Sequence, residues 1–211
     1  MPHRKIALIR GYKSFRAGDY SEQKALYEKL GKHGQHPKIM LIACADSRVD
    51  PTDIFDAYPG EMFVVRNVAN IVPPVDPTGG YHGTSASIEY AVNEIGVESI
   101  VVMGHESCGG IHGCLQGMGD NPEKGYVNKW LSLINGVRDT VMGKNIPKEQ
   151  LQFEMELENV RQSIRNLGTF DFVKKAIEED RLKLQGAYFS IIRARLLLSD
   201  EDGNFTEVAS I

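Results

Sequence analysis

The sequence predicts an α/β fold in which helices flank a central, mainly parallel β-sheet and N-terminal helices pack on a partner subunit. From residue 38 onward, short β-rich apolar runs alternate with helical patterns, which is typical of an α/β sheet. The apolar runs end in polar or glycine-containing turns, whereas the first 36 residues are basic and helical in pattern. We therefore expect a helical arm at residues 1–36 and a single α/β domain at 37–211.

The arm is distinguished by its charge. Residues 1–38 carry nine Lys and Arg against three Asp and Glu, and the remainder carries fifteen against twenty-five. Apolar side chains between Ile6 and Phe15 alternate with these charges at helical spacing, which predicts an amphipathic helix lying on the body or on a partner subunit. A nucleic-acid-binding arm is the alternative. A second helix is expected from Ser21 to Leu30, with Gly31 as its stop.

The domain is expected to begin with a strand and a short helix. Asp50 and Pro51 have the residue types of an N-cap and a first helical position, which predicts a helix that ends near Tyr58. A longer helix should run from Thr84 to Ile95 and stop at Gly96. Strands are expected at 38–44, 61–66, 98–103, 182–189 and 194–198, with a turn at 202–203.

The polar region 125–179 is expected to form three scaffold helices, broken near 143–147 and 168. Its glutamates at positions 154, 156 and 158 are interpreted as a solvated face.

Composition excludes several classes of protein. The chain is 42% hydrophobic and 25% charged, as in ordinary globular proteins. Its longest apolar run, 39–45, is far shorter than the ~20 residues of a membrane span, and the basic N-terminus lacks the apolar core of a secretory signal. We therefore expect a cytoplasmic protein with no membrane partner. Three cysteines cannot build a disulfide framework, so each is interpreted as buried, metal-binding or catalytic.

Two segments place metal-binding side chains directly after predicted strands: 44–48 (Cys-Ala-Asp-Ser-Arg) and 104–110 (Gly-His-Glu-Ser-Cys-Gly-Gly). If the strands before them are parallel neighbours, both segments emerge at one edge of the sheet, where ligands gather. Cys44, His105 and Cys108 then form a tetrahedral Zn²⁺ set that lacks its fourth ligand.

Asp46 decides what such a centre does. If Asp46 binds the metal, the centre is closed. If Asp46 instead pairs with Arg48 in a forked ion pair, the fourth position is open to water, which a bound cation makes acidic enough to become a nucleophile.

Two alternatives concern the cysteines. Taken alone, Cys44 has the pattern of a buried core cysteine. A local zinc knuckle of His105, Cys108, His112 and Cys114 is the second alternative, but a helix over 109–116 turns positions 112 and 114 roughly 200° apart. We interpret His112 and Cys114 as packing residues.

With these residues, the chain resembles the β-class carbonic anhydrases. The resemblance rests on segments 44–48 and 104–110, on 63–70 (Phe-Val-Val-Arg-Asn-Val-Ala-Asn) and on 87–91 (Ser-Ile-Glu-Tyr-Ala). It implies Zn²⁺ held by Cys44, His105 and Cys108, with Asp46 as an exchangeable fourth ligand and partner of Arg48. The implied reaction is the reversible hydration of carbon dioxide to bicarbonate and a proton by zinc-bound hydroxide.

The resemblance also implies a substrate site. Gln35, Phe63 and Tyr90 match the glutamine, phenylalanine and tyrosine of the plant-like group, whose active site is always accessible. They imply a narrow apolar slot walled by Phe63 and Tyr90, with the amide of Gln35 supplied by a partner subunit. The group regulated by bicarbonate carries a tryptophan where this chain has Leu41. The implied assembly is a homodimer that can pair further.

This chain departs from the family pattern at Ala45 and Glu106, and Glu106 adds negative charge near the metal. Two further functions stay open: a hydrolase of carbon disulfide or carbonyl sulfide with the same zinc centre, and a non-catalytic zinc protein with a nucleic-acid-binding arm.

Overall fold

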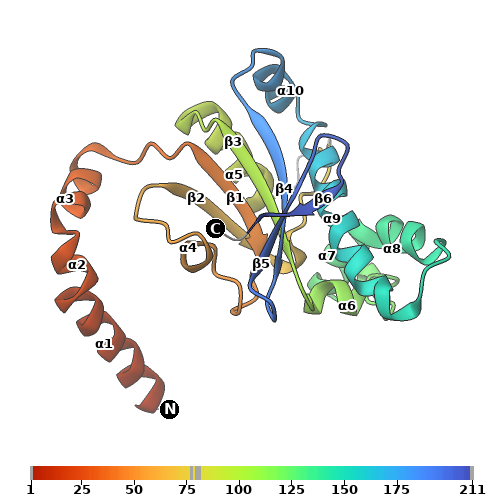
Figure 1. The fold of residues 1–211 in the computed structure, drawn as a ribbon, viewed down its shortest axis with the longest axis horizontal. Coiled ribbons are helices and arrows are strands. Elements are labelled where there is room, and N and C mark those ends of the chain that lie inside the picture. The colour runs from red at the N-terminus through yellow and green to blue at the C-terminus, as the bar shows by residue number, and fades with distance from the viewer. Residues whose placement is uncertain (1, 77, 79–81, 210–211) are drawn as a thin grey trace.

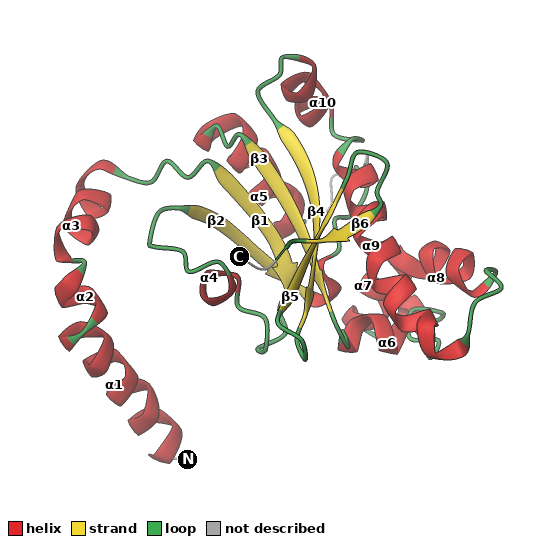
Figure 2. Ribbon diagram, in the orientation of Figure 1, coloured by secondary structure: helices red, strands yellow, loops and turns green. Residues whose placement is uncertain are grey.

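The computed structural model describes residues 2–76, 78 and 82–209, and it contains one six-stranded sheet flanked by helices (Figures 1 and 2). The strand order is β2-β1-β3-β4-β5-β6. The first four strands in this order are parallel, and the last two are antiparallel additions at one edge. The strands are β1 (Ile39–Cys44), β2 (Met62–Asn67), β3 (Ser99–His105), β4 (Lys183–Ser190), β5 (Arg195–Ser199) and β6 (Phe205–Glu207). The mainly parallel α/β fold expected from the sequence is confirmed.

Helices of the domain lie against the sheet and beyond the end of β3 (Figure 2). They are α4 (Pro51–Ile54), α5 (Gly83–Glu89), α6 (Gly109–Leu115), α7 (Tyr126–Leu131), α8 (Asn135–Met142), α9 (Leu151–Leu167) and α10 (Asp171–Glu178). A π-helical turn, Tyr90–Ile95, continues α5 and ends at the left-handed Gly96. None of the helices in the described ranges is long and apolar enough to cross a membrane.

The core is built from alternating side chains of the central strands, since successive residues of a strand face opposite sides of the sheet. Met40 and Ile42 of β1 belong to the cluster that includes residues of α5, α9 and α10, whereas Leu41 and Ala43 belong to the cluster on the other face. Five of the six β1 residues are buried, as expected for a central parallel strand. This rigid layer fixes where the polar segment after Cys44 begins.

The sequence placed most elements within two residues of their observed ends. Asp50 caps α4 as expected, because its carboxylate accepts a hydrogen bond from the Thr52 N–H, but the helix ends at Ile54 and not at Tyr58. The first of the three helices expected over 125–179 is split into α7 and α8. Strand β6, three residues long, was missed.

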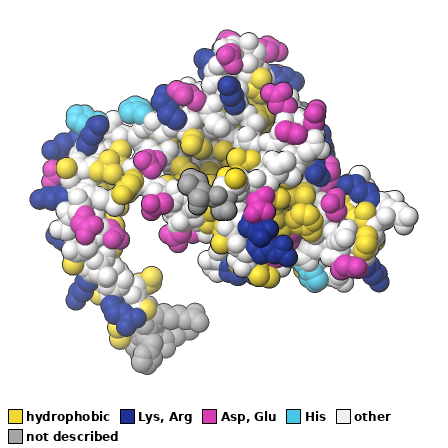
Figure 3. Space-filling view, viewed as in Figure 1, with side chains coloured by type: hydrophobic (Ala, Val, Ile, Leu, Met, Phe, Trp, Pro, Cys, Tyr) yellow, Lys and Arg dark blue, Asp and Glu magenta, His cyan; other side chains and the backbone are white. Residues whose placement is uncertain are grey.

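The arm consists of α1 (Pro2–Ala17), α2 (Asp19–Glu22) and α3 (Lys24–His33). Its first part projects from the body, with open space beside α1 in Figure 3, whereas the Leu30 side chain of α3 lies against Gly60 of the body. Contrary to expectation, the second helix does not start at Ser21 and stop at Gly31: a break at Gln23 separates α2 from α3, and α3 continues to the left-handed Gly34. Large apolar side chains of α1 stay exposed, among them Ile6 at 60% and Leu8 at 77%.

Candidate metal centre

The candidate metal-binding side chains meet where β1 and β3 end. These strands are parallel neighbours with Ala43 opposite Met103, so Cys44 and His105 reach the same edge of the sheet. Cys108, at the start of α6, completes the group. The two Sγ atoms lie 3.9 Å apart, and the candidate ligand atoms of Cys44, His105 and Cys108 all lie within 4.8 Å of one another. The convergence expected from the sequence is therefore present.

His105 is oriented as a metal ligand. It is the last residue of β3 and is buried. Its Nδ1 lies 3.0 Å from the carbonyl oxygen of Glu106, and a carbonyl only accepts, so Nδ1 carries the proton. Nε2 is then an unprotonated, buried nitrogen, and its lone pair has no hydrogen-bond partner among the described residues. A ring nitrogen fixed in this way by a backbone carbonyl is characteristic of metal-binding histidines, and the donor set fits Zn²⁺.

The two thiols of the cluster have pKa values shifted in opposite directions. A hydrogen bond from Cys108 lowers the pKa of Cys44, and the backbone N–H groups of Asp46 and Ala69 lower it further. The pKa of Cys108 is raised, first by its hydrogen bond with Cys44 and then by burial. One thiolate therefore forms readily, whereas a second beside it requires a positive charge between them.

Asp46 faces Arg48 and does not belong to the cluster of three ligands. Arg48 donates from Nε to Oδ1 at 2.9 Å and from NH2 to Oδ2 at 2.7 Å. The hydrogen bond from Arg48 is the main reason that the pKa of Asp46 is well below its usual range. Of the two arrangements that the sequence left open, the structure contains the ion pair.

Arg66 on β2 holds the loop that carries Asp46. Its guanidinium donates to the carbonyl oxygens of Cys44 at 2.9 Å and Asp46 at 2.6 Å, and to the carboxylate of Asp50 at 2.7 Å. Sequence reasoning gave Arg66 no role. Its position at the end of the predicted strand 61–66, beside segment 44–48 in the sheet, is the signal that could have suggested one.

A second support is the turn after β2. Ala69 and Asn70 both have left-handed backbones, with φ of 64° and 45°, which is uncommon for non-glycine residues. Asn159 of α9 donates to the Ala69 carbonyl oxygen at 2.8 Å, and Ser163 Oγ accepts from the Val72 N–H at 3.1 Å. The helix α9 thus stabilises the turn whose Ala69 N–H contributes to the thiolate of Cys44.

Comparisons of the sequence with a family model and with known proteins all point to one family. The family model described as "Carbonic anhydrase" matches residues 39–196. Beta carbonic anhydrase 3 of Arabidopsis thaliana is 34% identical over 197 residues, which cover 91% of this chain and 75% of the relative. A carbonic anhydrase of Synechocystis sp. is 34% identical over 195 residues, 92% of this chain and 70% of the relative. The chain belongs to the β-carbonic anhydrase family.

Solved structures of the β-carbonic anhydrases share the fold. The enzyme CcaA superposes with a TM-score of 0.90 at 32% identity, covering 99% of this chain and 93% of that chain. One of two tetrameric β-carbonic anhydrases from the filamentous ascomycete Sordaria macrospora superposes with a TM-score of 0.77 at 30% identity, covering 99% and 98%.

The residues expected to bind substrate in this β-carbonic anhydrase lie away from its metal-binding cluster. Phe63 is in register with Met40, near the start of β1, about 13 Å along the strand from the level of Cys44 at ~3.3 Å per residue. Tyr90 packs against Phe63, with ring centroids 6.0 Å apart. Gln35 is exposed just before β1. Within one chain, the three residues therefore lie towards the amino ends of the central strands, whereas the candidate metal ligands lie at the carboxyl ends.

The rival zinc knuckle is not formed. The helix α6 carries His112 and Cys114 away from the three-ligand cluster. Cys114 is a buried packing residue as expected, but His112 is exposed, with Nδ1 3.2 Å from Oε1 of Gln152. Its interpretation as a packing residue was wrong.

Two glutamates have structural partners or burial that the sequence did not reveal. The carboxylate of Glu106 accepts hydrogen bonds from Ser190 Oγ at 2.9 Å and the Ile192 N–H at 3.0 Å, so it fixes the connection after β4. Glu156, expected on a solvated face, is 3% exposed. Position 156 lies on the face of α9 that carries the buried Val160 and Ser163, and this helical spacing is the signal that could have placed it inside.

Proposed function

We propose that this chain catalyses the reversible hydration of carbon dioxide to bicarbonate and a proton, with Zn²⁺ held by Cys44, His105 and Cys108. The observation that carries the proposal is the unpaired, buried Nε2 of His105 beside two thiols. When bound, Zn²⁺ supplies a Lewis acid that lowers the pKa of a water ligand enough to give a hydroxide nucleophile near neutral pH.

We assign Asp46 the task of orienting the nucleophile. Because Arg48 holds both of its carboxylate oxygens, Asp46 stays ionised and is kept from acting as a fourth ligand. An ionised carboxylate next to the metal site accepts a hydrogen bond from the attacking oxygen. Arg48 is thus a positioning residue, and its NH2 also binds the Ser107 carbonyl oxygen at 3.1 Å.

The substrate slot is proposed to form between two copies of the chain. Gln35, Phe63 and Tyr90 lie towards the edge of the sheet opposite the metal-binding cluster, so a second copy must supply them to it. A homodimer, or a higher even-numbered oligomer, meets this requirement, and the exposed apolar side chains of α1 offer a surface for it. The two Sordaria macrospora enzymes are tetrameric. Gln35 would donate its amide to an oxygen of the substrate, where charge develops during attack.

We further propose that the arm, residues 1–36, and the α/β domain, 37–211, are distinct units, and that the enzyme works in the cytoplasm. Three buried free cysteines, two of them proposed metal ligands, suit a reducing compartment.

Sedimentation of a variant that lacks residues 1–20 tests the role of the arm in dimer formation. We expect dissociation and lower solubility, whereas a well-behaved, fully active monomer would refute the dimer.

A stopped-flow pH-indicator assay of carbon dioxide hydration tests the function. The zinc-loaded protein should be active, and Asp46→Asn should lose activity while retaining stoichiometric zinc. Cys44→Ser should lose the metal itself. Carbonyl sulfide and carbon disulfide are assayed alongside. Turnover of these substrates without hydration of carbon dioxide, or a folded protein that carries no stoichiometric metal, would overturn the proposal.

A further inference from the structure

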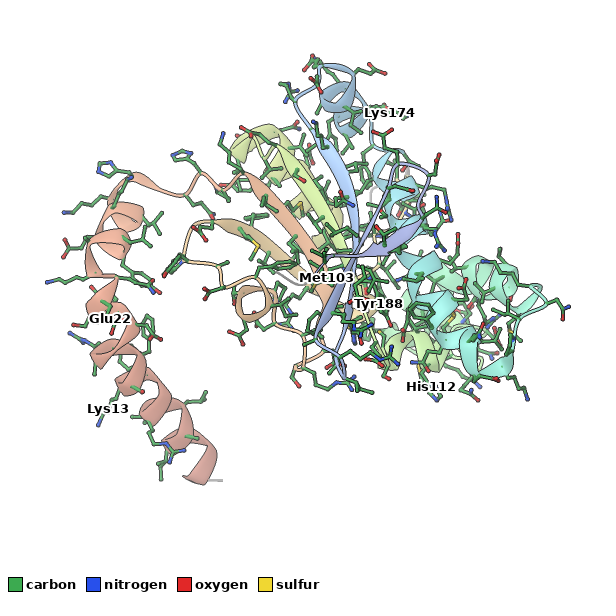
Figure 4. All side chains as sticks on the ribbon, viewed as in Figure 1. Lys13, Glu22, Met103, His112, Lys174 and Tyr188 are labelled. Carbon is green, nitrogen blue, oxygen red and sulfur yellow. The ribbon has the colours of Figure 1, made fainter. Side chains whose placement is uncertain are left out.

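Glu156 is a buried carboxylate directly behind the metal-binding cluster. It comes from α9, far from the ligand segments in the sequence, and its Oε1 accepts a hydrogen bond from the backbone N–H of Cys108 at 2.9 Å. Gln152 Nε2 donates to the same oxygen at 3.0 Å, and the hydroxyl of Tyr188 donates to Oε2 at 2.8 Å. Tyr188 lies on β4, near the centre of the sheet in Figure 4. The carboxylate is therefore held from three directions.

The peptide between Ser107 and Cys108 is bound at both of its ends. Its N–H donates to Glu156, and its carbonyl oxygen accepts from Arg48 NH2 at 3.1 Å. Burial raises the pKa of Glu156, but three donors face its carboxylate and favour the ionised form. A carboxylate at the N–H end and a guanidinium at the carbonyl end both align with the dipole of the peptide, and such charge-assisted hydrogen bonds are stronger than neutral ones. Ser107 has a left-handed backbone with φ of 57°, a conformation that requires support in a non-glycine residue.

This arrangement joins two functional groups of the site. From Glu156 the chain of contacts runs through one peptide to Arg48, and from Arg48 to the carboxylate of Asp46. Cys108 follows the clamped peptide immediately, so the direction of its side chain depends on how that peptide is held. A change at Glu156 must therefore reach the Cys108 sulfur first and the Asp46–Arg48 pair second.

We propose that Glu156 is a positioning residue of the metal centre, which fixes the Ser107–Cys108 peptide and thereby places the Cys108 thiolate relative to Cys44 and His105. The proposal rests on the proposed zinc site. Glu156 does not touch the reacting atoms, so its effect is on the geometry and retention of the metal, and on activity only through them.

Glu156→Gln is the informative variant because it keeps the size of the side chain and one oxygen acceptor. The amide NH2 cannot accept from Tyr188, and the negative end of the clamp is lost. Glu154→Gln on the same helix is the matched control, because Glu154 pairs with Lys144 on the surface at 3.5 Å and touches no ligand segment. Tyr188→Phe removes one donor to Glu156 and keeps the ring, so it should give a smaller change in the same direction.

The test measures the Zn²⁺ affinity of each variant by competition with a chelator, and the absorption spectrum of the cobalt-substituted protein. For Glu156→Gln we expect zinc affinity to fall by about 10- to 100-fold, as is typical for partners of metal ligands, and the thiolate-to-cobalt bands to shift. Glu154→Gln should match the wild type in both readouts. Thermal unfolding of the zinc-loaded variants identifies a purely structural effect.

If Glu156→Gln lowers only the unfolding temperature and leaves the zinc affinity and the cobalt spectrum at wild-type values, the positioning role is refuted. Failure of the proposed function would give a different result. In that case the wild type itself would bind no stoichiometric metal, or would bind metal that Cys44→Ser does not remove. If Glu156→Gln does not fold, Tyr188→Phe decides the question by the same two readouts.

Discussion

Arg48 holds the carboxylate of Asp46 from two residues further along the chain, with a forked pair of hydrogen bonds at 2.9 and 2.7 Å. The backbone N–H of Arg48 donates a third, to Oδ1 at 3.0 Å. Because a carboxylate so occupied has little capacity left for a metal, this local turn keeps Asp46 available for its proposed task of orienting the nucleophile.

Removing Arg48 should therefore impair activity without removing the metal. In Arg48→Ala, Asp46 is free to approach the cluster as a fourth ligand, and we expect hydration to fall by about 10- to 100-fold. Stoichiometric zinc should be retained, with a lower affinity because the Ser107 carbonyl oxygen also loses its hydrogen bond from Arg48. Arg48→Lys should recover only part of the activity, because an ammonium cannot form the fork. Zinc analysis and stopped-flow rates on the same preparations check this. Wild-type rates in Arg48→Ala would contradict the role of the pair.

Asp50 should make stability depend on pH. Hydrogen bonds from Thr52 and the nearby charge of Arg66 lower its pKa in the folded state. A carboxylate with a lowered pKa contributes stability above its unfolded pKa of ~3.9, and this contribution is lost as the pH falls towards the folded value. Asp50→Asn keeps an N-cap side chain and loses the charge. We expect it to cost no more than about 1 kcal/mol at pH 7, since the Asp50 side chain is 41% exposed.

The measurement is urea unfolding of wild type and Asp50→Asn at pH 7 and pH 3, with both proteins in the same metal state. The difference between their free energies of unfolding should shrink at the lower pH. A difference that stays constant would mean that the charge of Asp50 does not contribute, and that the capping hydrogen bond alone matters.

The sequence located the candidate metal ligands because the two segments follow short apolar runs typical of buried strands, and parallel neighbours end at one edge. It did not reveal Glu156, because alternating charges at 154, 156 and 158 resemble a solvated face unless position 156 is aligned with Val160 and Ser163. It could not place Gln35, Phe63 and Tyr90 relative to the metal, because the distance between them and Cys44 along the strands is a property of the fold, and their proposed target is on another chain.

Close packing at the start of α6 gives a further prediction. A Cβ added to Gly110 would lie 3.0 Å from Ala69 Cβ and from Val68 Cγ1, in the turn whose Ala69 N–H lowers the pKa of Cys44. Gly110→Ala should therefore displace this turn, destabilise the protein by about 1–3 kcal/mol and weaken zinc retention. Gly109→Ala is the matched control, because its Cβ would meet nothing within 4 Å. Equal effects of the two variants in urea unfolding and zinc competition would exclude the packing explanation.

The proposed slot between two copies can be tested by mixing two defective chains. Asp46→Asn damages the metal side of a site, and Gln35→Ala combined with Phe63→Ala damages the substrate side. If each site takes its metal side from one chain and its substrate side from the other, a mixed dimer contains one site with both defects and one site with neither. Each variant alone should be nearly inactive. An equal mixture, dissociated and reassembled, should recover about a quarter of the wild-type activity per chain, because half of the randomly assembled two-fold dimers are mixed and each has one intact site. Sites contained within single chains would give the mixture only the mean of the two separate preparations, and Phe63 and Tyr90 would then have to reach Cys44 across about 13 Å of their own sheet.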